Sequence, residues 1–229
     1  ELGLLKMDFL GLRTLTVIHD TELAVRRKDP DFRIANLDYD DPDTYAMLAK
    51  GETEGIFQLE STGMTQVLVG MRPKNLEDII ALISLYRPGP MDSIPTYLRN
   101  RKDPSHVTYK TPQMAHIVDV TNGVVIYQEQ VMQICRELAG FSFGQADNVR
   151  RAMSKKKLKV MEAEREHFVH GCKEPGKECA GCVANGVPEN IANEIYDDMI
   201  SFASYAFNKS HAACYAYVAF QTAYLKCHY

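Results

Sequence analysis

The chain lacks several features that would assign it to common protein classes. No apolar run in its 229 residues approaches the roughly 20 residues needed to span a bilayer. Neither the P-loop nor the glycine-rich loop of protein kinases occurs, which excludes these two ways of binding a nucleotide. Residues 1–6 have neither the basic start nor the cleavage site of a secretory signal, so we expect a cytoplasmic protein.

The chain also lacks an initiator methionine, internal repeats and low-complexity tracts. Both of its ends lie within periodic apolar patterns, so we expect a piece of a longer protein. At 45% hydrophobic and 24% charged residues it has the composition of a globular protein, with one large domain or two small ones. Helical periodicity dominates, and it predicts a mainly α fold of about nine helices. Short strands are expected only at residues 4–10, 55–60 and 124–127.

Polar residues and glycines predict where several helices begin and end. An aspartate before Pro42 is a typical helix start, because the carboxylate caps the first turn and proline suits its first position. Gly140 is expected to end a helix. The expected N-terminal residues are Thr14, Asp40 or Asp41, Ser61 and Ser210.

The most distinctive stretch is a basic block at residues 148–159. Six of its twelve residues are cationic and none is acidic, although the whole chain has a formal net charge of −4. Such a block suits a polyphosphate or a nucleic-acid backbone, and arginine grips phosphate oxygens through parallel hydrogen bonds. Arg150 and Arg151 diverge by about 100° on a helix, so we expect one to bind phosphate and the other to pair with an acid. A solvated basic helix face is the alternative interpretation.

Two further segments contain candidate ligand-binding residues. Asp8 lies among bulky apolar residues, where a carboxylate must be paired or bind a metal. Lys209 and His211 flank Ser210 at an expected helix N-terminus, where backbone N–H groups, the helix dipole and cations together favour an anion. Plain capping with solvated neighbours is the alternative at this second place.

A loop at residues 170–187 contains four potential zinc ligands, His170, Cys172, Cys179 and Cys182. Only the last two have the common two-residue spacing of a zinc pair, and a second tight pair is missing. The loop is rich in glycine, so we expect a flexible surface excursion. Zinc is therefore the less favoured interpretation of these residues.

Six segments, read together, resemble the alpha subunit of bacterial DNA polymerase III, the family C replicative polymerase. They are ordered along nearly the whole chain, which is more specific than any single motif. They are KMDFLGLRTLT (residues 6–16), GIFQLES (55–61), LYRPGP (85–90), IYQEQVMQI (126–134), RRAMSKKK (150–157) and FNKSHAACYA (207–216).

The resemblance implies that residues 1–13 are the last piece of a polymerase β-like nucleotidyltransferase palm. Residues 14–229 would then form a multi-helical fingers domain. Asp8 matches the third of three aspartates that hold two Mg²⁺ ions in the family, and the other two lie upstream of this chain. The piece alone is therefore expected not to polymerise DNA, because one carboxylate cannot position both metals.

The same resemblance implies binding residues and partners. The basic side chains would contact the incoming dNTP and the primer–template DNA, while Gln128, Glu129 and Arg87 are equally compatible with a structural role. Sliding clamp, proofreading and clamp-loader subunits are expected partners of the intact chain. The implied phosphate-binding residues are Arg150, Arg151, Lys155, Lys156, Lys157, Lys209, Ser210 and His211.

Two other interpretations remain open. One is a non-catalytic helical nucleic-acid-binding module in which Asp8 is structural. The other is a helical interaction domain that uses the cysteine loop to bind zinc.

Overall fold

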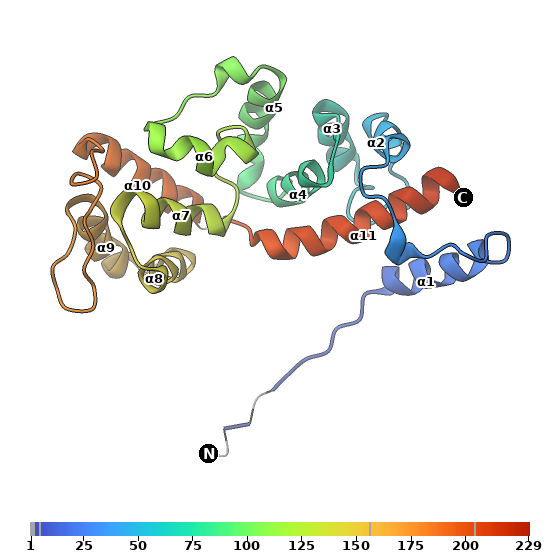
Figure 1. Ribbon diagram of the computed structural model, residues 1–229, viewed down its shortest axis with the longest axis horizontal. Helices are drawn as coiled ribbons and strands as arrows, with labels where there is room; N and C mark the ends of the chain where they lie inside the picture. Colours follow the sequence, from blue (N-terminus) through green and yellow to red (C-terminus); the bar gives the residue numbers. More distant parts are fainter. Residues whose placement is uncertain (1–2, 5, 156, 204) are drawn as a thin grey trace. The chain divides into compact units, whose positions relative to one another are not determined.

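The computed structural model describes residues 3–4, 6–155, 157–203 and 205–229. These residues contain eleven α-helices joined by turns and short 3₁₀ segments, so the predicted mainly α fold is confirmed (Figure 1). The chain divides into two compact units, Glu1–Leu76 with Ala216–Tyr229, and Glu77–Tyr215.

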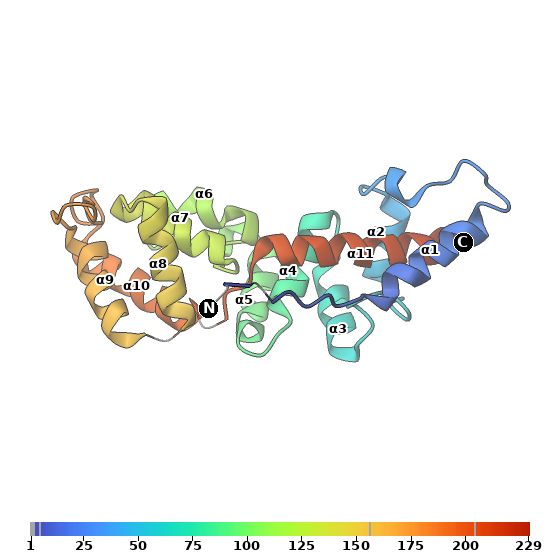
Figure 2. The same ribbon diagram turned by 90° about the horizontal axis from the view of Figure 1, so that it is seen from below.

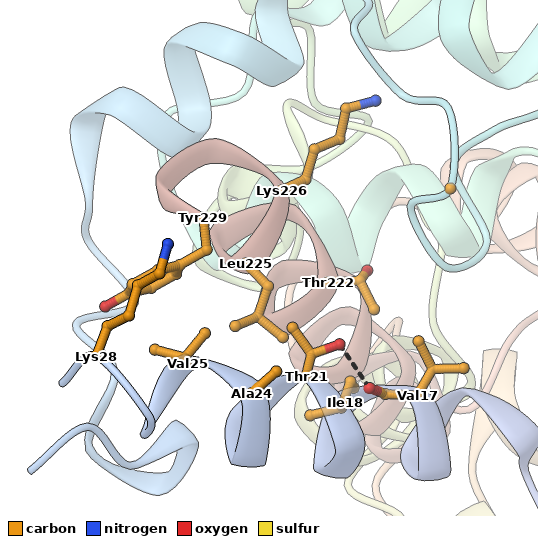
Figure 3. Close-up of a pocket in the computed structure, with 11 residues that line it drawn as sticks. Val17, Ile18, Thr21, Ala24, Val25, Lys28, Thr222, Leu225, Lys226 and Tyr229 are labelled. Atoms are coloured by element: carbon orange, nitrogen blue, oxygen red, sulfur yellow. Dashed lines mark hydrogen bonds between the residues drawn. The ribbon is translucent and has the colours of Figure 1, made fainter. Parts of the chain in front are cut away.

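The first unit contains three helices and most of a fourth. They are α1 (Arg13–Val25), α2 (Pro42–Ala49), α3 (Thr62–Met71) and the part of α11 (Lys209–His228) that follows Tyr215. Ile18 and Val25 of α1 pack with Leu225 of α11 in a small apolar cluster. The two helices line an open groove of about 470 Å³ beside this cluster (Figure 3).

Two of the three helix N-caps predicted in this unit are confirmed. The Asp41 carboxylate accepts a hydrogen bond from the Thr44 N–H at 2.8 Å, and the Ser61 hydroxyl accepts one from the Met64 N–H at 3.4 Å. Both predicted caps are confirmed. The Thr14 prediction is wrong, because α1 already begins at Arg13 and its N-cap Leu12 makes no side-chain capping bond.

The second unit contains the helices that carry the predicted phosphate-binding residues. Helices α7 to α10 gather around one core, which includes Ile134, Leu138, Val149, Phe168 and Tyr196 (Figures 1 and 2). Helix α7 ends at Gly140, which adopts φ +75°, so that prediction is confirmed. The helices are α4 (Leu76–Leu85, its first residue in the other unit), α5 (Ile94–Lys102), α6 (Ala115–Val118), α7 (Gln128–Ala139), α8 (Phe143–Ser154), α9 (Leu158–His170), α10 (Glu189–Ala203) and the first residues of α11.

The three predicted strands are not present in the described part of the chain. Residues 6–12 have no regular structure, and Phe9 and Leu10 are 90% and 93% exposed, so the expected buried strand does not form there. Residues 55–60 are turns, because Gly55 and Gln58 adopt positive φ values of 73° and 64°. Residues 124–127 contribute only one isolated bridge. Short apolar runs become strands only where a neighbouring strand pairs with their backbone, and in the described residues these three runs form no ladder beyond that bridge.

Candidate phosphate-binding site

Helix α8 presents the arginine pair, and one carboxylate holds both guanidinium groups. Arg150 donates from Nε and Nη2 to Oδ1 of Asp147, at 2.9 and 2.7 Å. Arg151 Nε lies 2.7 Å from the other oxygen, Oδ2. Asp147 lies three and four residues before the two arginines, and a helix places such residues side by side. The pair therefore shares one acid, whereas the sequence predicted that only one arginine would pair.

The two arginines differ in exposure. The Arg151 side chain is 64% exposed and the Arg150 side chain is 27% exposed, while Asp147 between them is 20% exposed. Hydrogen bonding from Arg150, opposed by partial desolvation and helped by the charges of both arginines, lowers the pKa of Asp147 below its ordinary value. The site thus combines two permanent cations with one firmly ionised acid.

The start of α8 is set by its own sequence. Ser142 Oγ accepts a hydrogen bond from the Gln145 N–H at 3.3 Å, and Gln145 Oε1 accepts one from the Ser142 N–H at 2.8 Å. This is a reciprocal capping box, which fixes where the helix begins and hence which face carries the arginines.

Gln128 connects the arginine pair to the segment before α11. Its Oε1 accepts a hydrogen bond from Arg150 Nη1 at 3.0 Å, and its Nε2 donates to the Ala206 carbonyl at 3.0 Å. The Gln128 N–H also donates to the Phe207 carbonyl at 3.0 Å, beside a parallel bridge between Tyr127 and Phe207. Gln128 therefore joins three segments that are far apart in the sequence.

Buried Gln130 holds the turn that carries Gln128. Its Oε1 accepts hydrogen bonds from the Ile126 and Tyr127 N–H groups, at 2.8 and 2.9 Å. Its Nε2 donates to the Ile117 carbonyl at 3.0 Å and to Thr121 Oγ1 at 2.8 Å. Each polar atom of this amide is satisfied, as a buried polar group requires.

The N-terminus of α11 already has side-chain acceptors from this protein. Asn208 Oδ1 accepts a hydrogen bond from the His211 N–H at 2.9 Å, so Asn208 is the N-cap. The prediction that Ser210 caps the helix is wrong, because α11 begins at Lys209 and Ser210 lies within its first turn. The carboxylate of Glu129 accepts from the Lys209 N–H at 3.1 and 3.2 Å, the position where the sequence suggested an external anion.

The side chains of the predicted FNKSH residues extend from this helix start. Lys209 Nζ pairs with Glu77 at 3.0 Å and lies 5.3 Å from the centre of the Tyr127 ring. His211 is exposed, and its ring packs against Phe207 and Tyr215 at centroid distances of 5.4 and 4.4 Å. The exposed Ser210 lies beside them on the first turn.

The LYRPGP motif packs on the same segment. The Arg87 guanidinium lies 4.2 Å from the centre of the Phe207 ring, a cation–π arrangement. Gly89 adopts φ +105°, and a Cβ built there would lie 2.1 Å from a carbon of the Tyr205 ring. This close approach requires glycine. The motif therefore helps to place the residues that lead into α11.

The remaining predicted cations lie between α8 and α9. Lys155 and Lys157 are exposed, and Lys157 is the N-cap residue of α9. Lys156 lies outside the described residues. These lysines follow directly on the helix that carries the arginine pair.

Three residues of the site were not identified from the sequence as partners of the arginine pair and of α11: Asp147, Gln128 and Glu129. A signal existed for Asp147, because its spacing of three and four residues from the arginines is that of helical ion pairs. The contacts of Gln128 with Arg150 and Ala206 and of Glu129 with Lys209 had no local signal, since they span 22, 78 and 80 positions.

Asp8 does not form a metal site with its surroundings. Its side chain is 72% exposed, and Oδ1 lies 3.9 Å from Lys6 Nζ. No group of three or more His, Cys, Asp or Glu side chains within the described part of the chain is arranged to hold a metal ion. The described residues around Asp8 do not by themselves fit a Mg²⁺ site.

The four potential zinc ligands are divided among different environments. His170 lies 3.7 Å from Glu189, and Cys182 is fully buried in the α7–α10 core. Cys172 and Cys179 face each other across an isolated antiparallel bridge. The loop therefore contains local backbone pairing. Its flexibility is not tested by this pairing and stays a prediction.

The fold and the site define a class of protein: a helical domain in which Gln128 joins an arginine helix to the segment before α11, and Glu129 caps the start of α11. Residues 14–176 match the model of the bacterial DNA polymerase III alpha subunit finger domain, which is more than half of the chain. The chain belongs to this family, as the sequence motifs predicted.

Curated relatives agree with this assignment. A DNA polymerase III subunit alpha from Thermus aquaticus is 50% identical over 234 residues, covering all of this chain and 18% of that protein. The proteins of the same name from Staphylococcus aureus strain Mu50 and Staphylococcus epidermidis are each 46% identical over 230 residues, covering all of this chain and 21% of each protein. The chain thus spans about a fifth of the length of these relatives.

No helix in the described ranges is both long enough and apolar enough to cross a membrane.

Proposed function

We propose that this chain is the fingers region, with a short piece of palm at residues 1–13, of the catalytic subunit of a bacterial replicative DNA polymerase. In this proposal it binds the incoming dNTP and the primer–template DNA for Mg²⁺-dependent nucleotidyl transfer. The supporting observation is the geometry of Arg150 and Arg151, two adjacent guanidinium groups held by one carboxylate.

The arginine pair suits the triphosphate for an electrostatic reason. Negative charge builds up on the leaving pyrophosphate during nucleotidyl transfer, and fixed cations stabilise it without reorganising. Asp147 and Gln128 fix Arg150 in one orientation before any ligand arrives. The more exposed Arg151, together with Lys155, Lys156 and Lys157, would extend the cationic surface along the phosphates or the DNA backbone.

The FNKSH residues would contribute to the same nucleotide and DNA site. We propose that Lys209 and His211 contact phosphate or sugar groups through their side chains, with Ser210 beside them. The backbone N–H of Lys209 is less suited to an external anion, because the Glu129 carboxylate accepts from it.

We further propose that Asp8 is one Mg²⁺ ligand in the intact subunit, completed by carboxylates outside this chain. The metal ions would supply charge neutralisation at the reacting phosphate. Sliding clamp, proofreading and clamp-loader subunits are proposed partners of the intact protein, which would act in the cytoplasm on the chromosome.

The test is single-nucleotide incorporation by the intact subunit carrying Arg150→Ala or Arg151→Ala. We expect kcat/KM for the dNTP to fall about 100-fold for each variant, the loss typical of a desolvated charge contact. The Kd for primer–template should change less than about threefold. Arg165→Ala is the matched control, because this arginine on α9 is also paired with an acid, Asp197.

Two outcomes would contradict the proposal. Equal losses for Arg165→Ala and the two site variants would mean that α8 and α9 matter only for stability. A loss confined to DNA binding, with unchanged dNTP kinetics, would favour a nucleic-acid-binding module instead.

A further inference from the structure

The cysteine loop contains a pair of thiols in direct cross-strand register. The Cys172 N–H donates to the Cys179 carbonyl at 3.0 Å, and the Cys179 N–H donates to the Cys172 carbonyl at 2.9 Å. Residues that exchange both hydrogen bonds face each other in an antiparallel pair, and their side chains lie on the same side of it. The chain reverses between them through Gly176, which adopts φ +82°.

This register matches the geometry of a disulfide. The Cα atoms of a hydrogen-bonded antiparallel pair lie about 5.5 Å apart, which is close to the commonest Cα separation across a disulfide. We propose that Cys172 and Cys179 form a reversible disulfide that closes this hairpin, making the loop a thiol-oxidation site.

The base of the hairpin holds the two strands together before any bond forms. Gly171 and Gly181 cross at close range, and a Cβ built on Gly181 would lie 2.3 Å from the Gly171 nitrogen. The Gly181 N–H donates to the Ala139 carbonyl at 2.9 Å, and the Cys182 N–H donates to the Phe168 carbonyl at 2.8 Å. The two segments are therefore tied to the helical core just beyond the cysteines, which holds Cys172 and Cys179 in this register.

Exposure separates this pair from the other cysteines of the core. Cys172 and Cys179 are half-buried and accessible to a small reagent, whereas Cys135 and Cys182 are fully buried. Burial raises the pKa of the Cys182 thiol to about 12, and burial also raises that of Cys135. A thiol that stays protonated and covered does not exchange.

The oxidant is a low-molecular-weight disulfide. Cys179 Sγ donates to the His167 carbonyl at 3.6 Å, and burial raises the pKa of Cys179, so we expect Cys172 to react first. Its thiolate attacks one sulfur of the reagent, forming a mixed disulfide while one reagent thiol leaves. Cys179 then attacks Cys172 Sγ and releases the second reagent thiol. Two protein thiols are oxidised, one reagent disulfide is reduced to two thiols, and the two protons pass to those thiols.

The test uses the intact subunit equilibrated with mixtures of oxidised and reduced glutathione. Free thiols are then blocked by alkylation, and the protein is digested and examined by tandem mass spectrometry. We expect the peptides that contain Cys172 and Cys179 to be joined, with the loss of two hydrogens, in oxidising mixtures and separate in reducing ones. Fragment ions should assign the bond to these two residues.

Single variants decide the assignment. Cys172→Ser and Cys179→Ser should each abolish the joined peptides, and circular dichroism checks that both variants are folded. Cys214→Ser, at an exposed cysteine on α11, should leave the bond unchanged. The proposal fails if the bond joins Cys179 to Cys182, if glutathione remains on one cysteine without closure, or if stoichiometric zinc protects the thiols until a chelator is added.

Discussion

The carboxylate of Glu129 accepts a hydrogen bond from the backbone N–H of Lys209, with both oxygens within 3.2 Å. Glu129 lies in the first turn of α7, and Lys209 is the first residue of α11. A negative charge at a helix N-terminus is stabilised by the unpaired N–H groups and the helix dipole. The protein therefore supplies from its own chain an anion that helix starts often take from a ligand.

Replacing this carboxylate should destabilise the start of α11. For Glu129→Ala we expect the free energy of unfolding to fall by about 1–2 kcal/mol, because a charge-assisted hydrogen bond is lost and the Lys209 N–H is left unpaired. Urea denaturation followed by circular dichroism measures this difference. Glu166→Ala, at an exposed glutamate on α9, is the control and should change stability by less than about 0.5 kcal/mol. Equal effects of the two variants would show that the Lys209 contact contributes nothing specific.

Removing the shared acid should change the kinetics of the arginine pair. For Asp147→Asn in the intact subunit we expect KM for the dNTP to fall about twofold to threefold, because an opposing charge beside the cations is lost. We expect kcat to fall about tenfold, because the two guanidinium groups lose their common anchor. Pre-steady-state incorporation separates the two effects. Asp197→Asn, which unpairs Arg165 on α9, should leave both constants within about twofold, and a matching loss there would contradict this role.

The Asp147 contact should also depend on pH. Its folded pKa lies below the ordinary value of 3.8, so the ionised form is favoured by folding. The stability that it contributes is fully present above the unfolded pKa of about 3.9 and is lost as the pH falls through the lower folded value. The difference in urea midpoint between the parent chain and Asp147→Asn should therefore be constant from about pH 5 upward and shrink below about pH 4. A difference that grows on acidification would contradict the assignment.

The turn at Gly89 should not accept a side chain. For Gly89→Ala we expect stability to fall by about 2–4 kcal/mol, because φ of +105° is strained for alanine and the new Cβ would overlap the Tyr205 ring. Gly144→Ala is the matched control, since it lies in α8 with nothing within 4 Å of the added Cβ. That variant should raise stability by up to about 1 kcal/mol. Thermal unfolding of the two variants measures the difference. Unchanged stability of Gly89→Ala would contradict the requirement for glycine beside the Tyr205 ring.

Local sequence signals were sufficient for much of the helical framework. Asp41, Ser61 and Gly140 end or begin helices as expected, because capping depends on atoms three or four residues away. The expected strands failed for a non-local reason, since an apolar run such as residues 124–127 needs a partner strand to satisfy its backbone. In the described residues that run finds only a single bridge to Phe207.

The candidate site shows the same limit. The arginine pair was evident from the sequence, because Arg150 and Arg151 stand within a dense basic block. Their anchoring was not fully evident, because Gln128 and Arg150 are 22 residues apart and no periodicity relates them. Ser210 was misassigned as a cap for a smaller reason: Asn208, two residues earlier, offers an equally good acceptor, and the helix takes the earlier start.

The two contacts of the Gln128 amide restrict which residue types can replace glutamine at this position. One end of the planar group must accept from Arg150, and the other must donate to the Ala206 carbonyl. Glutamate, the closest isostere, would keep the acceptor but set a second oxygen against that carbonyl. Lysine would donate to the Ala206 carbonyl but could not accept from Arg150. Methionine would fill the space while leaving both partners unpaired. Among the unbranched aliphatic side chains, glutamine is the one of this length that is neutral and both donates and accepts, so the polarity of one amide couples the arginine helix to the entry of α11.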